Sequence, residues 1–182
     1  MRRWLPLFAL TTMLAGADPD YQSAHAKLHR IGDRKLKHSE TVVFTPREIN
    51  AWARVAVPEY VPHGIREPHV ELGNGTANGS ALVDLTKIRA GGVNPLIANL
   101  IQGERPLKIA VRLESGGGRC TVHLTRVELG EIVADGVILN LLVKVFFLPL
   151  FPDARIDEPF DLDYDIDRIE IRPDGVRVTA KR

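Results

Sequence analysis

The sequence predicts an α+β fold in which an antiparallel sheet built from hairpins packs against two or three helices. Three observations support this prediction. Apolar and polar residues alternate in paired segments that flank Gly-rich or Pro-Asp-Gly turns, which is the pattern of β-hairpins. Other segments carry apolar residues at helical spacing. The hairpins follow one another without long crossovers, which favours antiparallel pairing with the helices on one face of the sheet.

A short β-type run at 41–44 leads into the first predicted helix, residues 46–56. Thr45 can cap this helix, and Glu48 lies three residues later, as in a capping box. A proline in the first helical turn strengthens the signal. Pro58 is expected to end the helix. The apolar face comprises Ile49, Trp52, Ala53 and Ala56.

Three hairpins are predicted, and a short helix at 94–102 separates the first two. Their turns are Gly73-Asn74-Gly75, Gly116-Gly117-Gly118 and Pro173-Asp174-Gly175. In the second hairpin the apolar parity slips after Leu124, which predicts a β-bulge near Thr125-Arg126. In the third, Ile169 and Ile171 are expected to meet Val176 and Val178 across the turn.

The first 17 residues have the layout of a cleavable secretory signal. Arg2 and Arg3 precede an apolar stretch of about ten residues, which Ala15-Gly16-Ala17 follows as a cleavage site. The apolar stretch is well short of the roughly 20 residues that span a bilayer. We therefore expect an exported protein, periplasmic or extracellular after cleavage.

The remainder is predicted to contain one domain. Residues 18–40 are polar and read as a loose N-terminal arm or a short helix, and residues 41–182 form a single α+β domain. Cys120 is the only cysteine, so the chain cannot form an internal disulfide. Its place in an apolar alternation favours a buried structural thiol.

The charge balance argues against two classes of partner. The predicted signal holds two basic residues and no acidic ones, so the remainder is close to neutral. A near-neutral chain lacks the basic footprint of a nucleic-acid binder, and no nucleic-acid partner is expected. It also lacks a polybasic anchor for anionic membrane surfaces.

Residues 136–151 are apolar in almost every direction. On a helix, Asp135 would cap the segment, Pro149 would end it, and Asn140 and Lys144 would share one narrow polar stripe. Such a helix must be buried or must meet something apolar. Three explanations stay open: a central core element, the wall of a cavity for an acyl chain, or a surface that dips into a membrane or meets a partner. A buried strand is an alternative to the helix.

The phrase Phe44-Thr45-Pro46-Arg47-Glu48-Ile49-Asn50-Ala51 resembles the opening of certain bacterial cell-envelope domains. These are the LmeA-like phospholipid-binding and YpmS-like families, which are related to the tubular lipid-binding superfamily. The later order of hairpins, apolar stretch and closing hairpin is similar too, although the strands look short for a full tubular fold. The resemblance implies a curved sheet wrapped around a helix, with apolar residues facing a groove.

These observations lead to the hypothesis of an envelope protein that binds a lipid or similar apolar molecule non-covalently. Lys144 is placed to meet a headgroup phosphate. The remaining candidate contacts are Trp52, Leu139, Leu142, Val143, Phe146 and Phe147. Peripheral membrane contact fits this hypothesis. The alternative is a structural or protein-interaction module with a fully packed core and no small ligand.

No convincing catalytic or metal-binding pattern emerges from the sequence. Serines lack the Gly-x-Ser-x-Gly context of a nucleophile elbow. His25 and His29 would align on a helix, but zinc sites need three or four convergent ligands. The alternating Asp161, Asp163, Asp165 and Asp167 would share one face of a strand and do not match a calcium-binding loop. We therefore expect a protein that is not an enzyme and that binds neither a cofactor nor a metal ion.

Overall fold

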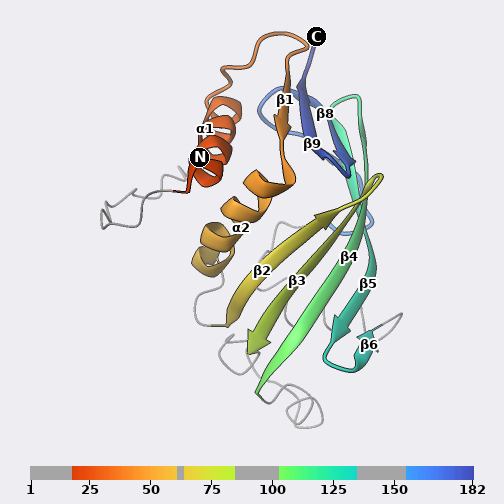
Figure 1. Cartoon of the computed structure of the whole chain (residues 1–182). Coiled ribbons are helices and arrows are strands. Elements are labelled where there is room, and N and C mark those ends of the chain that lie inside the picture. The colour runs from red at the N-terminus through yellow and green to blue at the C-terminus, as the bar shows by residue number, and fades with distance from the viewer. Residues whose placement is uncertain (1–17, 61–63, 85–102, 135–154) are drawn as a thin grey trace, which may run out of the picture.

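The computed structural model describes residues 18–60, 64–84, 103–134 and 155–182. Within these ranges the chain is α+β, as predicted, with more strand than helix (Figure 1). The helices are α1 (Pro19–Gly32) and α2 (Pro46–Tyr60). Both lie on the same side of the molecule in Figure 1, and α2 runs next to β2 (Ile65–Leu72).

The strands form two antiparallel sheets, where the sequence led us to expect one. The smaller sheet has the order β1-β9-β8, and the larger has the order β2-β3-β4-β5-β6, with β7 pairing with β5 as well. The strands besides β2 are β1 (Thr41–Phe44), β3 (Thr76–Asp84), β4 (Glu104–Gly116), β5 (Arg119–Leu129), β6 (Ile132–Ala134), β7 (Phe160–Asp161), β8 (Ile166–Arg172) and β9 (Gly175–Ala180).

All three predicted hairpins are confirmed. In the last one, Ile169 lies opposite Val178 and Ile171 opposite Val176. The predicted bulge is confirmed too: consecutive residues of β4 lie opposite Arg126 and Leu124 of β5, which leaves Thr125 as the extra residue. The strands of this hairpin are longer than the apolar alternation predicts, because β4 has 13 residues and β5 has 11.

Hydrogen bonds join the two sheets along one edge of β8. The amide of Gly75 donates to the carbonyl of Ile171 (2.9 Å), and the amide of Gly118 donates to the carbonyl of Asp167 (2.7 Å). Between them, the amide of Ile169 donates to Ser115 Oγ at 2.9 Å. The turns of the first two hairpins therefore satisfy backbone groups that an edge strand would leave open.

Residues 18–40 contain a packed helix. Of the loose arm and the short helix that the sequence left open, the helix is therefore correct. Asp18 caps α1 by accepting a hydrogen bond from the amide of Asp20 at 3.0 Å. Ala24 and Ile31 are buried in a core shared with both β1 and the C-terminal hairpin. This core also includes Val42, Phe44, Ile166 and Val178.

The predicted start of α2 is confirmed and its predicted end is wrong. Glu48 donates its amide to Thr45 Oγ1 (3.3 Å) and accepts from the Thr45 amide (2.7 Å), which completes the capping box. The helix continues through Pro58 to Tyr60. Proline removes one hydrogen-bond donor, and near a helix end that loss interrupts little of the ladder.

Asn50 connects α2 to the larger sheet. Its side-chain Nδ2 donates to the carbonyl of Val70 (2.9 Å), and its Oδ1 accepts from the amide of Val70 (2.8 Å). Asn50 itself is buried, and its Nδ2 also donates to the Pro46 carbonyl at 2.8 Å. One amide group thus pairs with the backbone of β2 as a neighbouring strand would.

Three predictions lie outside the described residues: the secretory signal at 1–17, the helix at 94–102 and the apolar segment at 136–151. Neither of the described helices is long and apolar enough to cross a bilayer.

Replacing Asn50 with Ala is expected to lower the free energy of unfolding by about 1–3 kcal/mol. The substitution leaves the N–H and C=O of half-buried Val70 without their partner. Urea unfolding followed by circular dichroism measures the change. Asn78→Ala is the matched control, because Asn78 is exposed on β3. Equal stability of the two variants would contradict a structural role for the Asn50 amide.

Candidate functional site

One face of the larger sheet is apolar along most of its length, and we call it the apolar face. Cross-strand pairing assembles it: Val111 lies opposite Ala77 of β3 and Leu124 of β5. Side chains alternate between the faces of a strand, so every second residue of β4 faces the same way. The face comprises Val70, Leu72, Ala77, Ala81, Val83, Leu107, Ile109, Val111, Leu113, Val122, Leu124, Val127 and Leu129.

Burial differs between parts of the apolar face. The four apolar side chains that β4 contributes to this face, from Leu107 to Leu113, are only half-buried. At the end of the face where β5 meets β6, by contrast, Val83, Val127 and Leu129 are buried. The central strand of the sheet thus retains apolar surface that the described part of the chain does not fully cover.

Arg105 continues the apolar row of β4 at its N-terminal end. It lies opposite Val83, which is 1% exposed, and two residues before Leu107 on the same face. Its guanidinium lies beside Gly130, in the turn between β5 and β6. Its Nε is buried and has no hydrogen-bond partner. Within the described ranges, no other buried side-chain nitrogen or oxygen lacks one. Such an atom in a native fold requires an explanation.

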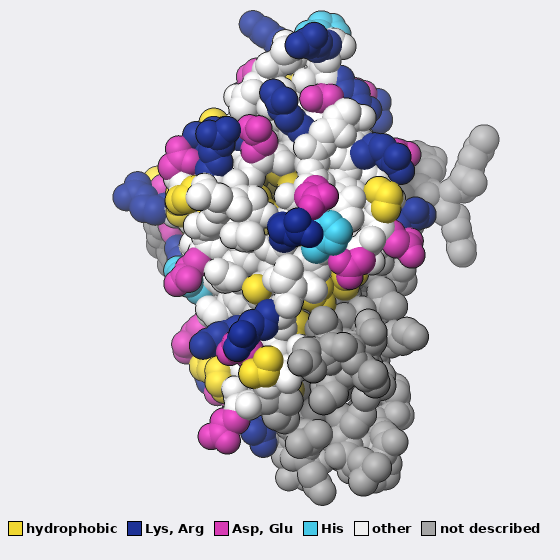
Figure 2. Space-filling model, turned by 90° about the vertical axis from the view of Figure 1, so that its right-hand side faces the viewer, with side chains coloured by type: hydrophobic (Ala, Val, Ile, Leu, Met, Phe, Trp, Pro, Cys, Tyr) yellow, Lys and Arg dark blue, Asp and Glu magenta, His cyan; other side chains and the backbone are white. Residues whose placement is uncertain are grey.

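The opposite face of the sheet is polar and holds a shallow groove of about 340 Å³. Three of its charged side chains pair with one another: Lys108 Nζ lies 3.8 Å from Glu128, and Arg126 Nε lies 2.5 Å from the same carboxylate. Figure 2 shows basic and acidic side chains interspersed on one side of the molecule, without a patch of one sign. A groove with internally paired charges offers little to a charged ligand.

Of the sequence-predicted contacts, the structure describes only Trp52. It lies on α2 and packs, half-buried, against the core between the helices and the smaller sheet. The six remaining candidates all fall at 139–147, outside the described residues. The apolar face and Arg105 are therefore additional to the site that the sequence indicated.

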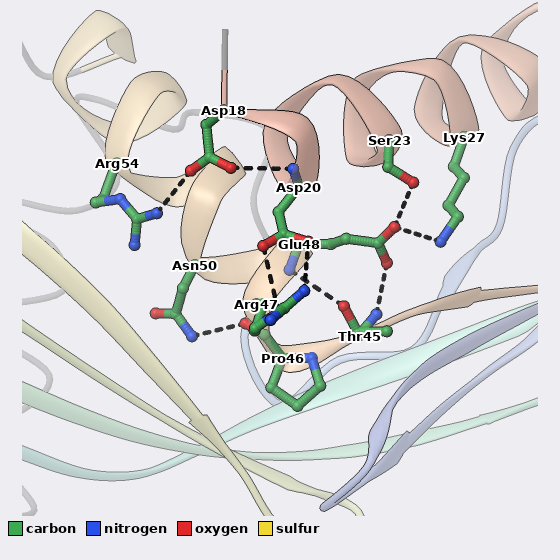
Figure 3. A network of polar contacts seen from close by, with 10 residues as sticks. All are labelled: Asp18, Asp20, Ser23, Lys27, Thr45, Pro46, Arg47, Glu48, Asn50 and Arg54. Carbon is green, nitrogen blue, oxygen red and sulfur yellow. Dashed lines mark hydrogen bonds and ion pairs between the residues drawn. The ribbon is translucent and has the colours of Figure 1, made fainter. Parts of the chain in front are cut away.

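A second polar cluster surrounds the carboxylate of Glu48 (Figure 3). Glu48 is 4% exposed, and its oxygens accept from Lys27 Nζ (2.5 Å), Ser23 Oγ (2.5 Å) and the amide of Thr45 (2.7 Å). Burial by itself would raise the pKa of Glu48. The hydrogen bonds from Lys27, Ser23 and Thr45, with the charge of Lys27, outweigh it and lower the pKa to about 2.

A strongly shifted pKa often marks a functional site. Here, however, both oxygens of Glu48 already bind groups of the protein, which come from α1 and from the start of α2. Neighbouring ion pairs join the same segments: Arg47 Nε to Asp20 at 3.3 Å, and Arg54 Nη2 to Asp18 at 3.1 Å (Figure 3). The arrangement fits a structural clamp better than a catalytic group.

The four alternating aspartates do not share a strand face, and that prediction is wrong. Asp161 belongs to β7 and Asp167 to β8, whereas Asp163 lies in a bend and Asp165 in a turn. The backbone turns at Tyr164 and Asp165, which both have a positive φ of 58°. Across the ranges that the structure describes, no group of three or more His, Cys, Asp or Glu side chains is placed to hold a metal ion.

The two candidate histidines do align on one face of α1. The ring centroids of His25 and His29 are 4.4 Å apart, in an edge-to-face arrangement. Tyr21 adds a third ring, 5.7 Å from that of His25. This spacing is that of an aromatic stack on a helix surface.

Cys120 is buried, as predicted. Burial raises the pKa of its thiol, although a hydrogen bond with Ser115 opposes this. The protonated thiol is a poor nucleophile, so Cys120 fits a packing role.

Comparisons of the chain with models of protein families, with curated proteins and with solved structures give no match.

Glu48 makes the stability of the fold depend on pH. Because its pKa falls from 4.5 to about 2 on folding, its contribution is fully present above pH 4.5 and is lost as the pH falls towards 2. This shift corresponds to about 3 kcal/mol. We expect Glu48→Gln to be less stable at pH 7 and to lose less stability than the parent between pH 5 and pH 2.5.

Urea unfolding at a series of pH values measures this difference. Glu59→Gln is the control, since Glu59 is an exposed residue of the same helix. If Glu48→Gln and Glu59→Gln showed the same acid dependence, the buried carboxylate would not be the source of the effect.

Proposed function

We propose that the protein is an exported cell-envelope protein that binds a lipid or another apolar ligand non-covalently against the apolar face. The observation that carries this proposal is the half-buried apolar row on β4, from Leu107 to Leu113. The proposed role is binding, with no catalytic step.

Apolar surface left in contact with water costs about 25 cal/mol per Å² relative to burial. A central strand of a sheet would ordinarily place its inward side chains in a tightly packed core. Long side chains that stay half-buried along a strand favour a ligand that completes their contacts. Small-molecule sites are typically lined by apolar groups with a few placed polar ones.

Two sequence features support export and a lipid ligand. Residues 1–17 have the layout of a secretory signal, and the 44–51 phrase resembles envelope domains that bind phospholipid. In this proposal the sheet curves around the ligand. Trp52 and the apolar residues at 139–147 add contacts.

The second candidate is a structural or protein-interaction module whose apolar face is covered entirely by protein. Val83, Val127 and Leu129 are buried at one end of the face. At that end, complete coverage by protein is favoured over a small ligand. The two candidates differ in what accompanies the purified protein, so one measurement separates them.

Native mass spectrometry of protein recovered without detergent, from cells that express the full chain, is the first test. We expect an adduct of phospholipid mass near one per chain, identified after organic extraction. A folded protein with the mass of the bare chain would refute lipid carriage and favour the interaction module.

Val111→Asp is expected to remove the adduct, because it places a charge in the centre of the apolar face. Ala110→Asp is the matched control: it adds the same charge one residue away, on the opposite face, where Arg126 lies across from it. Equal lipid content in the two variants would mean that the ligand does not contact the apolar face.

A further inference from the structure

We propose that Arg105 binds the anionic headgroup of a phospholipid whose acyl chains lie along the apolar face. This inference rests on the proposed function and specifies the ligand that the face would take. Arg105 stands at one end of the row that continues through Leu107 and Ile109 on β4. A cation followed by an unbroken apolar row matches an amphiphile with a negative head.

The dimensions of the face fit this class of ligand. From Arg105 to Leu113 the row extends roughly 26 Å, at about 3.3 Å per residue. Across the sheet, apolar residues occur on β2, β3, β4 and β5. Three spacings between neighbouring strands amount to roughly 14 Å, which is wide enough for two acyl chains side by side. A phospholipid with two chains therefore uses more of the face than a single fatty acid.

Arg105 differs from the neighbouring arginines of the sheet, which each bind a carboxylate. Arg66 binds Glu104 through two hydrogen bonds, at 2.8 and 2.6 Å, and Arg112 binds Glu114 at 2.8 Å. Arg126 binds Glu128 at 2.5 Å. For Arg105 the described part of the chain supplies no hydrogen bond to the buried Nε. In this inference, the headgroup of the bound lipid supplies the acceptor that the guanidinium lacks.

The chemistry of the guanidinium favours phosphate as that acceptor. Its planar fork of N–H donors matches two oxygens of a phosphate, and the pair is stronger where water is excluded. Arg105 lies beside buried Val83, at the end of the face where Leu129 is also buried. A guanidinium nitrogen buried without a hydrogen bond is costly, and a phosphate at this position would offset that cost.

Uptake of defined lipids tests this assignment. The purified full-chain product is stripped of lipid and incubated with dispersions of phosphatidylglycerol or of diacylglycerol, which has the same acyl chains and no phosphate. After it is reisolated, its bound lipid is measured by native mass spectrometry. We expect the unaltered protein to prefer phosphatidylglycerol. Arg105→Gln should lower uptake of phosphatidylglycerol roughly ten-fold or more and leave uptake of diacylglycerol nearly unchanged.

Arg112→Gln is the matched control. It removes the same charge from the same strand, but on the opposite face, where Arg112 pairs with Glu114. Arg105→Lys keeps the charge and much of the aliphatic stem. We expect it to take up phosphatidylglycerol several-fold less well, because an ammonium cannot form the two-pronged contact. This variant decides the question if Arg105→Gln does not fold.

The outcomes distinguish this inference from the proposed function. If the unaltered protein takes up neither lipid, the proposed function fails and this inference fails with it. If it takes up lipid and the folded Arg105 variants keep the uptake and preference of the Arg112→Gln control, Arg105 is not the headgroup contact, and the proposed function stands. Selective loss of phosphatidylglycerol in the Arg105 variants supports the assignment.

Discussion

The carboxylate of Glu48 holds together segments that the chain's own connectivity leaves separate. Lys27 and Ser23 reach it from α1, and the amide of Thr45 reaches it from the start of α2. Lys27 also donates to the carbonyl of Val43 in β1 at 2.7 Å. Two residues beyond Glu48, Asn50 pairs with β2. The start of one helix therefore sets the positions of the other helix, the smaller sheet and the edge of the larger sheet.

Local patterns predicted most of the secondary structure, and long-range contacts decided the rest. The hairpins and the capping box depend on residues close in sequence, and the bulge at Thr125 follows from a parity slip that one strand displays by itself. The separate smaller sheet depends on the pairing of β1 with β9, which are far apart in the sequence, and no local pattern encodes that pairing. The sequence did not firmly predict the helix at Pro19–Gly32. Only Ala24 and Ile31 of this helix are buried, so its apolar residues form no sustained helical pattern.

The candidate site was predictable in its chemistry and less so in its residues. An apolar surface was expected, and the alternation in β4 already contained one. The sequence prediction does not include Arg105, although its spacing from Leu107 and Ile109 puts a charge on the apolar side of the strand. The alternate spacing of the aspartates at 161–167 predicted a shared face, which depended on a continuous strand. The positive φ of Tyr164 and Asp165 breaks that strand.

The pairing of Asn50 with Val70 has a further consequence for how copies of the protein behave at high concentration. The outer edge of a sheet is a template on which another chain can add a strand, and this addition leads to domain swapping and fibrous aggregation. Here a side-chain amide already occupies the N–H and C=O of Val70 on that edge, towards the end of β2. Asn50 thus acts against self-association of the folded chain, in addition to fixing α2.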